Sequence, residues 1–394
     1  MPTKGSRTAL FGIVATIFVS STGIGSLFPV LPLYLRDRGA SYALVGVIVG
    51  AALVAQAIGQ WPAGILAERV GRREMMVAGL VVAAAASLAF VLPLSVPWLI
   101  AVRFIQGLGF AAVIPAEFAA VADVVPPDQL GRAYGWVAGA QQGGFIAGPA
   151  IGGLLTVFGR SAVFVVTGVA LLAAAGIVII TLKNASAAKV TSTTLSIAPL
   201  LLGRSRVGAA VRAVLILSVG LGFLIGIYDV VWSLFMRTLT SSDPLIGLSF
   251  TLFALPLLVA TPLAGWMADR WDRRWLAFWS IVLGSLIGPI YPFLKEIPVI
   301  FVIGAFEGSL WAFTGPSMNS FLMDAVTDRR AEAQGIVGTA MSAAIALGSL
   351  TGGSLFAVGV GVPFIAAAVA GVVFALIAVP GLRTAGSVAP QPVT

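Results

Sequence analysis

The chain of 394 residues has no cysteine and no histidine, and only 10% of its residues are charged. Without cysteine it forms no disulfide and no thiolate metal site. Without histidine it lacks the side chain that most often carries a proton near neutral pH, so any proton handling falls to carboxylates. The sequence also lacks a phosphate-binding loop, a dinucleotide fingerprint and a hydrolase nucleophile elbow. We therefore expect no enzyme, no cofactor and no bound metal.

Apolar residues dominate the sequence. Hydrophobic residues make up 59% of it and the mean hydropathy is +1.04, which leaves too little polar surface to cover a water-soluble globule. The apolar runs are continuous and about 20 residues or longer, which predicts membrane helices and not barrel strands. The 46 glycines and 22 prolines fit membrane helices, where small residues allow close packing. Because the net charge of +8 lies mainly in short connections, we expect a lipid bilayer as partner and no nucleic acid.

Twelve membrane spans are predicted between charged or Pro-, Gly- and Ser-rich connections. They are 8–35, 42–67, 75–94, 97–123, 133–158, 161–182, 210–236, 245–268, 276–294, 297–323, 333–358 and 361–382. The first run is long for the core of a signal peptide and has no clear small-residue cleavage site. We expect it to be a retained helix.

The sequence is built from two similar halves. The stretch GILAERVGRR at 64–73 returns as GWMADRWDRR at 265–274. Further landmarks repeat at nearly the same offset, namely Gly107 with Gly308, Pro115 with Pro316 and Asp123 with Asp324. Tandem copies of a membrane bundle are related by a pseudo-twofold axis along the membrane normal, with the substrate in the cleft between them. We predict an all-α membrane protein of two six-helix bundles, 1–182 and 210–394, joined by a cytoplasmic linker at 183–209 with a short interfacial helix near 195–202.

The basic residues predict the orientation of the chain. If both termini face the cytoplasm, the loops on that side hold most of the 23 Lys and Arg residues. The outer loops then hold only Arg36, Arg38, Arg160, Arg237 and Lys295. The excess of cations in cytoplasmic loops favours this orientation. We expect a multi-pass protein of a bacterial-type inner (cytoplasmic) membrane with both termini in the cytoplasm.

Several motifs carry a family resemblance across the whole chain. The doubled loop motif, Gly-x-x-Ala-Asp/Glu-Arg-x-x-Arg-Arg, resembles the hallmark of the major facilitator superfamily. The segment RFIQGLG at 103–109 resembles that superfamily's Arg-x-x-Gln-Gly-x-Gly motif, and FPVLPLY at 28–34 resembles its 12-helix branch. In span 5, Gly144-x-x-x-Gly148-Pro149-x-x-Gly152-Gly153 resembles the signature of the drug:proton antiporters. Span 11 has no matching form, since Gly348 is followed by Ser349 instead of proline, as in that family.

The loop motifs and span 5 supply the residues expected to act in gating. Loop carboxylates can accept hydrogen bonds near helix N-termini, and the paired arginines can pair with the aspartates that end spans 4 and 10. The glycines of span 5 share one helical face, and Pro149 bends the span. The expected gating residues are Glu68, Arg72, Arg73, Asp123, Gly144, Gly148, Pro149, Gly152, Asp269, Arg273, Arg274 and Asp324. Glu68 stands where the superfamily usually has aspartate. The alternative for the loop residues is that they are solvated charges that only set the topology. The alternative for the span 5 residues is ordinary helix packing.

Few ionisable groups remain at membrane depth, namely Arg103 and Glu117 in span 4, Asp229 in span 7 and Glu307 in span 10. A charge there costs about 2.5–3.5 kcal/mol, so each is a functional hypothesis. Acids in spans 7 and 10, with none in span 1, resemble a subgroup of Gram-positive multidrug antiporters whose C-terminal carboxylates carry the coupling protons. The resemblance assigns that role to Asp229 and Glu307. The alternative is that both carboxylates have a structural role and are held by hydrogen bonds to backbone or hydroxyl groups.

The remaining intramembrane charges each have two interpretations. Arg103 either takes part in proton coupling, by steering protonation of nearby acids, or is a cation tied to carbonyls. Glu117 either attracts cationic substrates from the inner side or locks the inner gate with an arginine. Aromatic residues follow the two acids at helical spacing, Trp232 after Asp229 and Trp311 after Glu307, which suits lipophilic cations. The expected substrate-binding residues are Glu117, Phe110, Gln141, Phe145, Tyr228, Trp232, Trp311 and Asn319.

These observations predict a secondary active transporter. We expect a monomer that exports amphiphilic or lipophilic, often cationic, small molecules in exchange for protons by alternating access. The alternative is a proton-coupled or facilitative transporter of one defined metabolite, such as a sugar, amino acid or lipid, which polar residues such as Gln141, Gln142 and Asn319 favour. A signalling receptor would need a larger soluble output region than either terminus provides.

Overall fold

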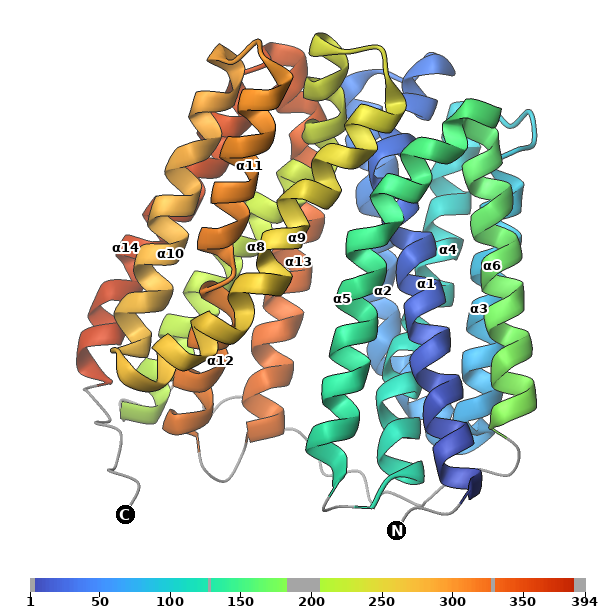
Figure 1. Ribbon diagram of the computed structural model, residues 1–394, viewed down its shortest axis with the longest axis horizontal. Helices are drawn as coiled ribbons and strands as arrows, with labels where there is room; N and C mark the ends of the chain where they lie inside the picture. The colour runs from blue at the N-terminus through green and yellow to red at the C-terminus, as the bar shows by residue number, and fades with distance from the viewer. Residues whose placement is uncertain (1–3, 127–128, 183–205, 327–329, 386–394) are drawn as a thin grey trace. The chain divides into compact units, whose positions relative to one another are not determined.

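The computed structural model describes residues 4–126, 129–182, 206–326 and 330–385, and these residues are helical apart from short connections (Figure 1). Ten helical segments in this part of the chain are long and apolar enough to cross a membrane. The predicted all-α membrane fold is therefore confirmed. Most of the predicted linker, 183–209, lies outside the described residues, as does the interfacial helix expected near 195–202.

Packing divides the chain into two compact units. Unit 1 comprises Met1–Ser192 and Trp232–Thr251, and unit 2 comprises Thr193–Val231 and Leu252–Thr394. Residues 232–251 belong by sequence to the second repeat, yet they pack within unit 1. The residues of the two packing units therefore differ from the residues of the two sequence repeats.

Unit 1 is a bundle of helices built from the first repeat. Its helices are α1 (Lys4–Asp37), α2 (Tyr42–Val70), α3 (Arg72–Ala89), α4 (Val96–Val124), α5 (Leu130–Leu155), the 3-10 turn η2 (Thr156–Phe158) and α6 (Arg160–Thr181). Helix α1 packs against α5 and α6, α2 against α4, and α3 against α4 and α6 (Figure 1). The unit also takes in the end of α8 (Arg206–Leu239) and the start of α9 (Asp243–Arg270).

Unit 2 is formed by the rest of α8 and α9 together with the later helices. These are α10 (Arg273–Ile287), the 3-10 turn η3 (Gly288–Phe293), α11 (Ile297–Trp311), α12 (Thr314–Ala325), α13 (Arg330–Val358) and α14 (Val362–Thr384). Helix α10 packs against α11, α12 and α14, and α13 packs against α12 and α14.

The packing confirms that the two repeats are equivalent at the landmark glycines. A Cβ atom at Gly107 of α4 would lie 2.3 Å from the backbone oxygen of Ala52 in α2. A Cβ atom at Gly308 of α11 would lie 2.1 Å from the backbone oxygen of Phe253 in α9. Because a real Cβ atom cannot come so close, each glycine lets its helix rest directly on the neighbouring backbone. The repeat seen in the sequence is thus a repeat of helix contacts.

Helix ends follow from local capping. Ser41 precedes α2 and its side chain accepts a hydrogen bond from the backbone N–H of Leu44 at 3.2 Å. Asp272 precedes α10 and accepts one from the backbone N–H of Arg274 at 3.0 Å. These bonds satisfy N–H groups that have no partner inside the helix. Between α2 and α3, Gly71 has a φ of 116°, a conformation that side-chain-bearing residues avoid.

The predicted span 297–323 corresponds to one segment, Ile297–Ala325, that is long and apolar enough to cross a membrane. Within it the helix is interrupted between α11 and α12 by a turn at Ala312 and Phe313, which the sequence did not predict. Pro316 contributes to the interruption, because proline has no N–H to donate to the carbonyl of Ala312 and its ring crowds that carbonyl. A hydrogen bond of 2.9 Å between the hydroxyls of Ser280 and Thr314 fixes the start of α12 against α10.

Candidate functional site

The paired arginines of the first loop motif have separate partners. Arg72 forms an ion pair with Asp123 at the end of α4, with 2.8 Å between Nη1 and Oδ2. Arg73 instead donates from Nη2 to the backbone oxygen of Ile179, near the end of α6, at 3.2 Å. The first arginine therefore ties α3 to α4, and the second satisfies a carbonyl in the last turn of α6, where a cation is favoured.

The second loop motif repeats this arrangement within unit 2. Arg273 forms an ion pair with Asp324 at the end of α12. Arg274 donates from Nη1 to the backbone oxygen of Leu382, near the end of α14, at 2.8 Å. Each motif thus ties together three helices of its own unit.

The two loop carboxylates differ. Asp269 accepts a hydrogen bond of 3.2 Å from Nη2 of Arg273. Glu68, at the equivalent position, is exposed and makes no ion pair within the part of the chain that the structure describes. The first repeat therefore has a longer side chain, Glu68, at this position and lacks the hydrogen bond to the arginine that Asp269 makes in the second repeat.

The glycines of α5 contact α1. Cβ atoms at Gly144, Gly148 and Gly152 would lie 2.6, 2.6 and 2.2 Å from α1, at Ser21, Thr22 and Ser26 respectively. Gly25 of α1 lies opposite Pro149, since a Cβ atom there would be 3.3 Å from the proline Cδ. The shared glycine face expected from the sequence is therefore the surface on which α1 and α5 meet.

A cluster of four charged residues, the Arg160 cluster, lies at the opposite end of unit 1 from the Arg72–Asp123 pair. Arg160 at the start of α6 donates from Nε and Nη2 to the two carboxylate oxygens of Asp243, at 2.7 and 2.9 Å. It also pairs with Asp37 at the end of α1. Arg237 near the end of α8 pairs with Asp243 at 3.0 Å. Two cations and two anions thus neutralise each other.

Sequence reasoning missed this cluster as a site. It used Arg160 and Arg237 only as outer-loop cations and did not single out Asp37 or Asp243. The available signal was that all four residues lie at span ends on the same predicted side of the membrane.

Two hydrogen bonds farther along the helices also join α8 and α9 to helices of the first repeat. The hydroxyl of Ser233 in α8 donates to the backbone oxygen of Phe28 in α1 at 3.0 Å. The hydroxyl of Thr251 in α9 donates to the backbone oxygen of Ile146 in α5 at 2.7 Å. Residues of the second repeat are therefore held to unit 1 over several turns of α8 and α9.

Glu307 of α11 is the centre of a polar cluster in the interior of unit 2. Its side chain is only 1% exposed. Tyr291 of η3 donates to Oε2 at 2.6 Å, and the indole N–H of Trp311 donates to Oε1 at 3.2 Å. The side chain of Tyr228 in α8 makes a third hydrogen bond. We call these four residues the Glu307 cluster. Tyr291 was not predicted from the sequence.

Two glycines lie beside the phenols of the Glu307 cluster, and Gly288 leaves space that a Cβ atom would fill. A Cβ atom at Gly288 would lie 2.4 Å from the hydroxyl oxygen of Tyr228, and one at Gly304 would lie 3.6 Å from that of Tyr291. Counted by the repeat that pairs Gly107 with Gly308, these glycines take the places of Ser87 and Arg103. Glycine at these two positions is the sequence signal that could have indicated that large side chains of other segments pack there.

Unit 1 has a different polar cluster at the equivalent place. Gln106, the repeat counterpart of Glu307, accepts a hydrogen bond from Nη1 of Arg103 and donates to the hydroxyl of Ser87 at 2.6 Å. Gln106 is fully buried and Arg103 is 7% exposed. The first repeat therefore carries an amide with a cation where the second carries an acid with three donors.

The other two residues predicted from span 4 lie in the interior of unit 1. Phe110 is packed in the hydrophobic core with Val113 and Ile17. Glu117 is 5% exposed, and its Oε1 atom is enclosed without a hydrogen-bond partner.

The remaining predicted substrate residues are spread over several helices. On α5, Gln141 and Phe145 are half-buried, and Phe145 stacks on Phe28 with 6.0 Å between ring centroids. The indole N–H of Trp232 donates to the hydroxyl of Ser249 at 2.8 Å. Asn319 is exposed and accepts a bond of 3.3 Å from Gln334. Asp229 is half-buried on α8.

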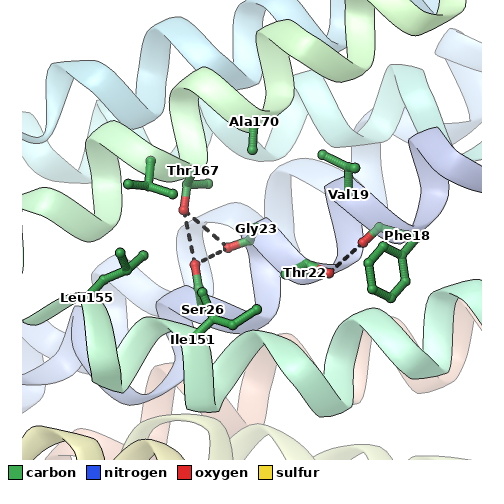
Figure 2. A pocket seen from close by; sticks show the side chains of 10 residues that line it. Phe18, Val19, Thr22, Gly23, Ser26, Ile151, Leu155, Thr167 and Ala170 are labelled. Atoms are coloured by element: carbon green, nitrogen blue, oxygen red, sulfur yellow. Dashed lines mark hydrogen bonds between the residues drawn. The ribbon is translucent and has the colours of Figure 1, made fainter.

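A pocket of about 190 Å³ lies in unit 1 among α1, α5 and α6 (Figure 2). Figure 2 shows Ser26 and Thr167 pointing toward each other, with 3.0 Å between their hydroxyls. Ser26 also donates to the backbone oxygen of Gly23 at 2.7 Å. Because the hydroxyls bond to one another and to the backbone, the remaining wall is apolar. Its lining contains none of the residues predicted as site residues.

The family model of the Major Facilitator Superfamily matches residues 13–230 and 214–392. The first match covers the first repeat and the start of the second, and the second match lies within the second repeat. The chain belongs to the major facilitator superfamily. It is accordingly a multi-pass membrane transporter of small molecules.

Two relatives within the superfamily carry names that describe resistance. Multidrug resistance protein 2 of Bacillus subtilis (strain 168) is 33% identical over 169 residues, which cover 43% of this chain and 42% of that protein. Quinolone resistance protein NorA of Staphylococcus aureus (strain COL) is 25% identical over 382 residues, which cover 93% of this chain and 96% of NorA.

Solved structures share the superfamily fold. A bacterial homolog of the human lysosomal transporter Spinster, in an inward-facing and occupied conformation, matches with a TM-score of 0.78 at 15% identity over 97% of both chains. A D-xylose–proton symporter matches with a TM-score of 0.74 at 17% identity, over 95% of this chain and 96% of that chain. At these identities the likeness concerns the fold alone.

Proposed function

We propose that this transporter exports amphiphilic or lipophilic, often cationic, organic compounds in exchange for protons by alternating access. The names of the two resistance-related relatives support the direction and the breadth of transport. We further propose a monomer in the cell membrane with both termini in the cytoplasm, as the distribution of basic residues favours.

The observation that carries the proposal is the buried carboxyl group of Glu307 among three hydrogen-bond donors. A carboxylate at this depth in a membrane protein costs free energy, and residues of this kind usually have a function. The three donors stabilise the charged form, and protonation of the acid would weaken these bonds or reverse the direction of one of them. Loading and unloading a proton therefore changes how α8, η3 and α11 are held together.

The donors also indicate which oxygen receives the proton. The indole N–H of Trp311 can only donate, so Oε1 has to remain an acceptor. The hydroxyl of Tyr291 can either donate or accept, so a proton on Oε2 could be donated to the phenol oxygen. We therefore assign the proton to Oε2. Asp229, which follows Tyr228 on α8, is proposed as the second coupling acid, and Arg103 as a cation that influences both.

The charged clusters at the two ends of unit 1 fit alternate closing of the transport path. In the proposed orientation the Arg72–Asp123 and Arg273–Asp324 pairs lie at the cytoplasmic end, with the Arg160 cluster at the outer end. Opening to the outside would require the ends of α8 and α9 to leave α1, α5 and α6. That movement would break the ion pairs of the Arg160 cluster.

The test is proton movement driven by substrate in proteoliposomes. Wild-type protein should release protons when a lipophilic cation is added and should transport it when a pH gradient is imposed. Asp229→Asn and Glu307→Gln should each lower substrate-induced proton release, because each variant lacks one of the acids that carry the protons. Unchanged release in both variants would refute the assignment of coupling to these acids.

A transporter of one metabolite is the second candidate, and one observation favours it. Gln141 of α5 is half-buried and its amide makes no hydrogen bond to the described residues, so it is available to a polar substrate. A transport panel of sugars, amino acids and lipophilic cations would separate the two candidates. Uptake of one polar compound, with no transport of the cations, would favour the metabolite.

A further inference from the structure

Glu117 is an acid inside the hydrophobic core of unit 1. On α4, its neighbours one turn away are Val113, Ala120 and Val121, each at most 1% exposed and each part of that core. Its own side chain is 5% exposed, and Oε1 is enclosed with no hydrogen-bond partner. Unlike Glu307, this carboxyl group accepts no hydrogen bond from the residues that the structure describes.

The charged groups around Glu117 are engaged elsewhere or exposed. Helix α4 packs against α1, α2, α3 and α5. On these helices Arg72 pairs with Asp123, Arg73 lies within 3.6 Å of Glu74, and Tyr134 donates to the backbone oxygen of Phe118 at 3.1 Å. The other ionisable side chains toward this end of the unit are exposed, namely Arg7, Glu68, Arg69 and Arg132. Within the described residues no cation forms an ion pair with Glu117.

An isolated carboxylate in such surroundings is strongly disfavoured relative to the neutral acid. A neutral acid still has an unsatisfied oxygen, but it avoids the far larger penalty of an unpaired buried charge. In the arrangement that the structure shows, Glu117 therefore carries its proton. It can ionise only when its surroundings become wet or when a cation comes to its side.

We propose that Glu117 is an additional proton-carrying site of the transporter, in unit 1, and that its ionised form binds the positively charged group of a substrate. The inference rests on the proposed function and extends it. Proton and cationic substrate compete for one carboxylate, so binding of a cation at Glu117 expels the proton. An uncharged substrate has no such effect there, whereas Glu307 couples transport of charged and uncharged compounds alike.

The experiment measures tetraphenylphosphonium binding and proton release by the purified full-length protein in weakly buffered detergent solution. Wild-type protein should bind the cation more tightly as the pH rises and release protons on binding. Glu117→Gln, which resembles the neutral acid in shape, should bind about tenfold more weakly, as expected for loss of a charge-assisted contact. It should also lose the part of the pH dependence and of the proton release that Glu117 contributes.

Two further variants complete the design. Glu117→Asp keeps the acid and should still release the proton, which serves as the test if the glutamine variant does not fold. Glu307→Gln should lose its own share of the release while keeping the dependence of affinity on Glu117.

The outcomes separate the two proposals. Equal affinity and equal proton release in wild type and Glu117→Gln would overturn the role of Glu117 and leave the proposed function intact. Loss of release in Glu117→Asp as well would also overturn it, because the acid would then be serving the structure alone. Absence of any release by wild-type protein would remove the proposed function and this inference together.

Discussion

Arg160 and Asp243 form a two-point ion pair, although one begins α6 and the other begins α9. The guanidinium also pairs with Asp37, and the carboxylate also pairs with Arg237. Planar guanidinium and carboxylate groups that meet in this way form strong and directional contacts. Residues of the second repeat are thereby fixed to helices of the first.

Breaking this ion pair should expose the contact between α8 and α1. In Asp243→Asn the two arginines lose their shared anion, so we expect a cysteine placed at the buried Ser233 to react faster with a membrane-impermeant maleimide. About tenfold is expected if roughly 1.4 kcal/mol of closing energy is lost. The native chain has no cysteine, so labelling has no background. Asp272→Asn, another acid at a helix start, is the control. Equal labelling in both variants would show that the pair does not hold this end closed.

Gly288 and Gly304 provide a matched pair of substitutions next to Glu307. In Gly288→Ala the new methyl group would lie 2.4 Å from the hydroxyl oxygen of Tyr228, so the phenol has to leave Glu307. In Gly304→Ala the methyl group meets Tyr291 at 3.6 Å, an ordinary contact. We expect Gly288→Ala to change the pH profile of transport and Gly304→Ala to resemble wild type. Tyr228→Phe, which removes the same hydrogen bond without a clash, should reproduce the effect of Gly288→Ala. If Tyr228→Phe keeps the wild-type profile, the hydrogen bond has no part in coupling.

The contact between α1 and α5 should be sensitive to one methyl group. Gly148→Ala would place a Cβ atom 2.6 Å from the backbone oxygen of Thr22, and overpacking of this kind costs typically about 1–3 kcal/mol. Gly139→Ala on the same helix has nothing within 4 Å and serves as the control. Thermal unfolding in detergent should show a lower midpoint for Gly148→Ala alone. A midpoint like that of the control would mean that the helices can separate here without loss.

Asp272 should give the fold a dependence on acid pH. The hydrogen bond from the Arg274 side chain, together with capping of α10, lowers the pKa of Asp272 below its usual value. A lowered pKa means that the stabilisation is fully present above the pKa of the unfolded chain, about 3.9, and is lost as the pH falls through the lower folded value. Asp272→Ala should lower stability by about 1 kcal/mol near neutral pH, as for other lost N-caps. Thermal unfolding of both proteins from about pH 7 to pH 3 should show the difference shrinking at the acid end. A difference that stays constant would mean that the carboxylate charge plays no part.

The sequence predicted contacts whose partners recur at matching positions of both repeats. The repeated arginines and aspartates pointed to the Arg72–Asp123 and Arg273–Asp324 pairs, and the landmark glycines pointed to close helix contacts. Contacts to backbone oxygens gave no such signal, because every residue has a carbonyl group. For that reason the bonds from Arg73 and Arg274 to the ends of α6 and α14 were not predicted.

Other features depended on tertiary structure. Tyr291 reaches Glu307 from η3, and no periodicity of α11 relates the two residues. The Arg160 cluster joins residues from four helix ends that are distant in the sequence. Proline position alone also did not decide where a helix breaks. Pro115 lies inside a continuous α4, whereas its counterpart Pro316 follows a turn.

That turn at Ala312 and Phe313 divides the predicted span 10 into two rigid pieces. Glu307 lies on α11, whereas Asp324, the partner of Arg273, lies on α12. The two acids are therefore not on one continuous helix. A displacement of α11 when its acid changes charge can be absorbed at the turn. A change at Glu307 therefore need not disturb the Arg273–Asp324 ion pair, so that the ion pair can stay closed while the acid gains or loses a proton.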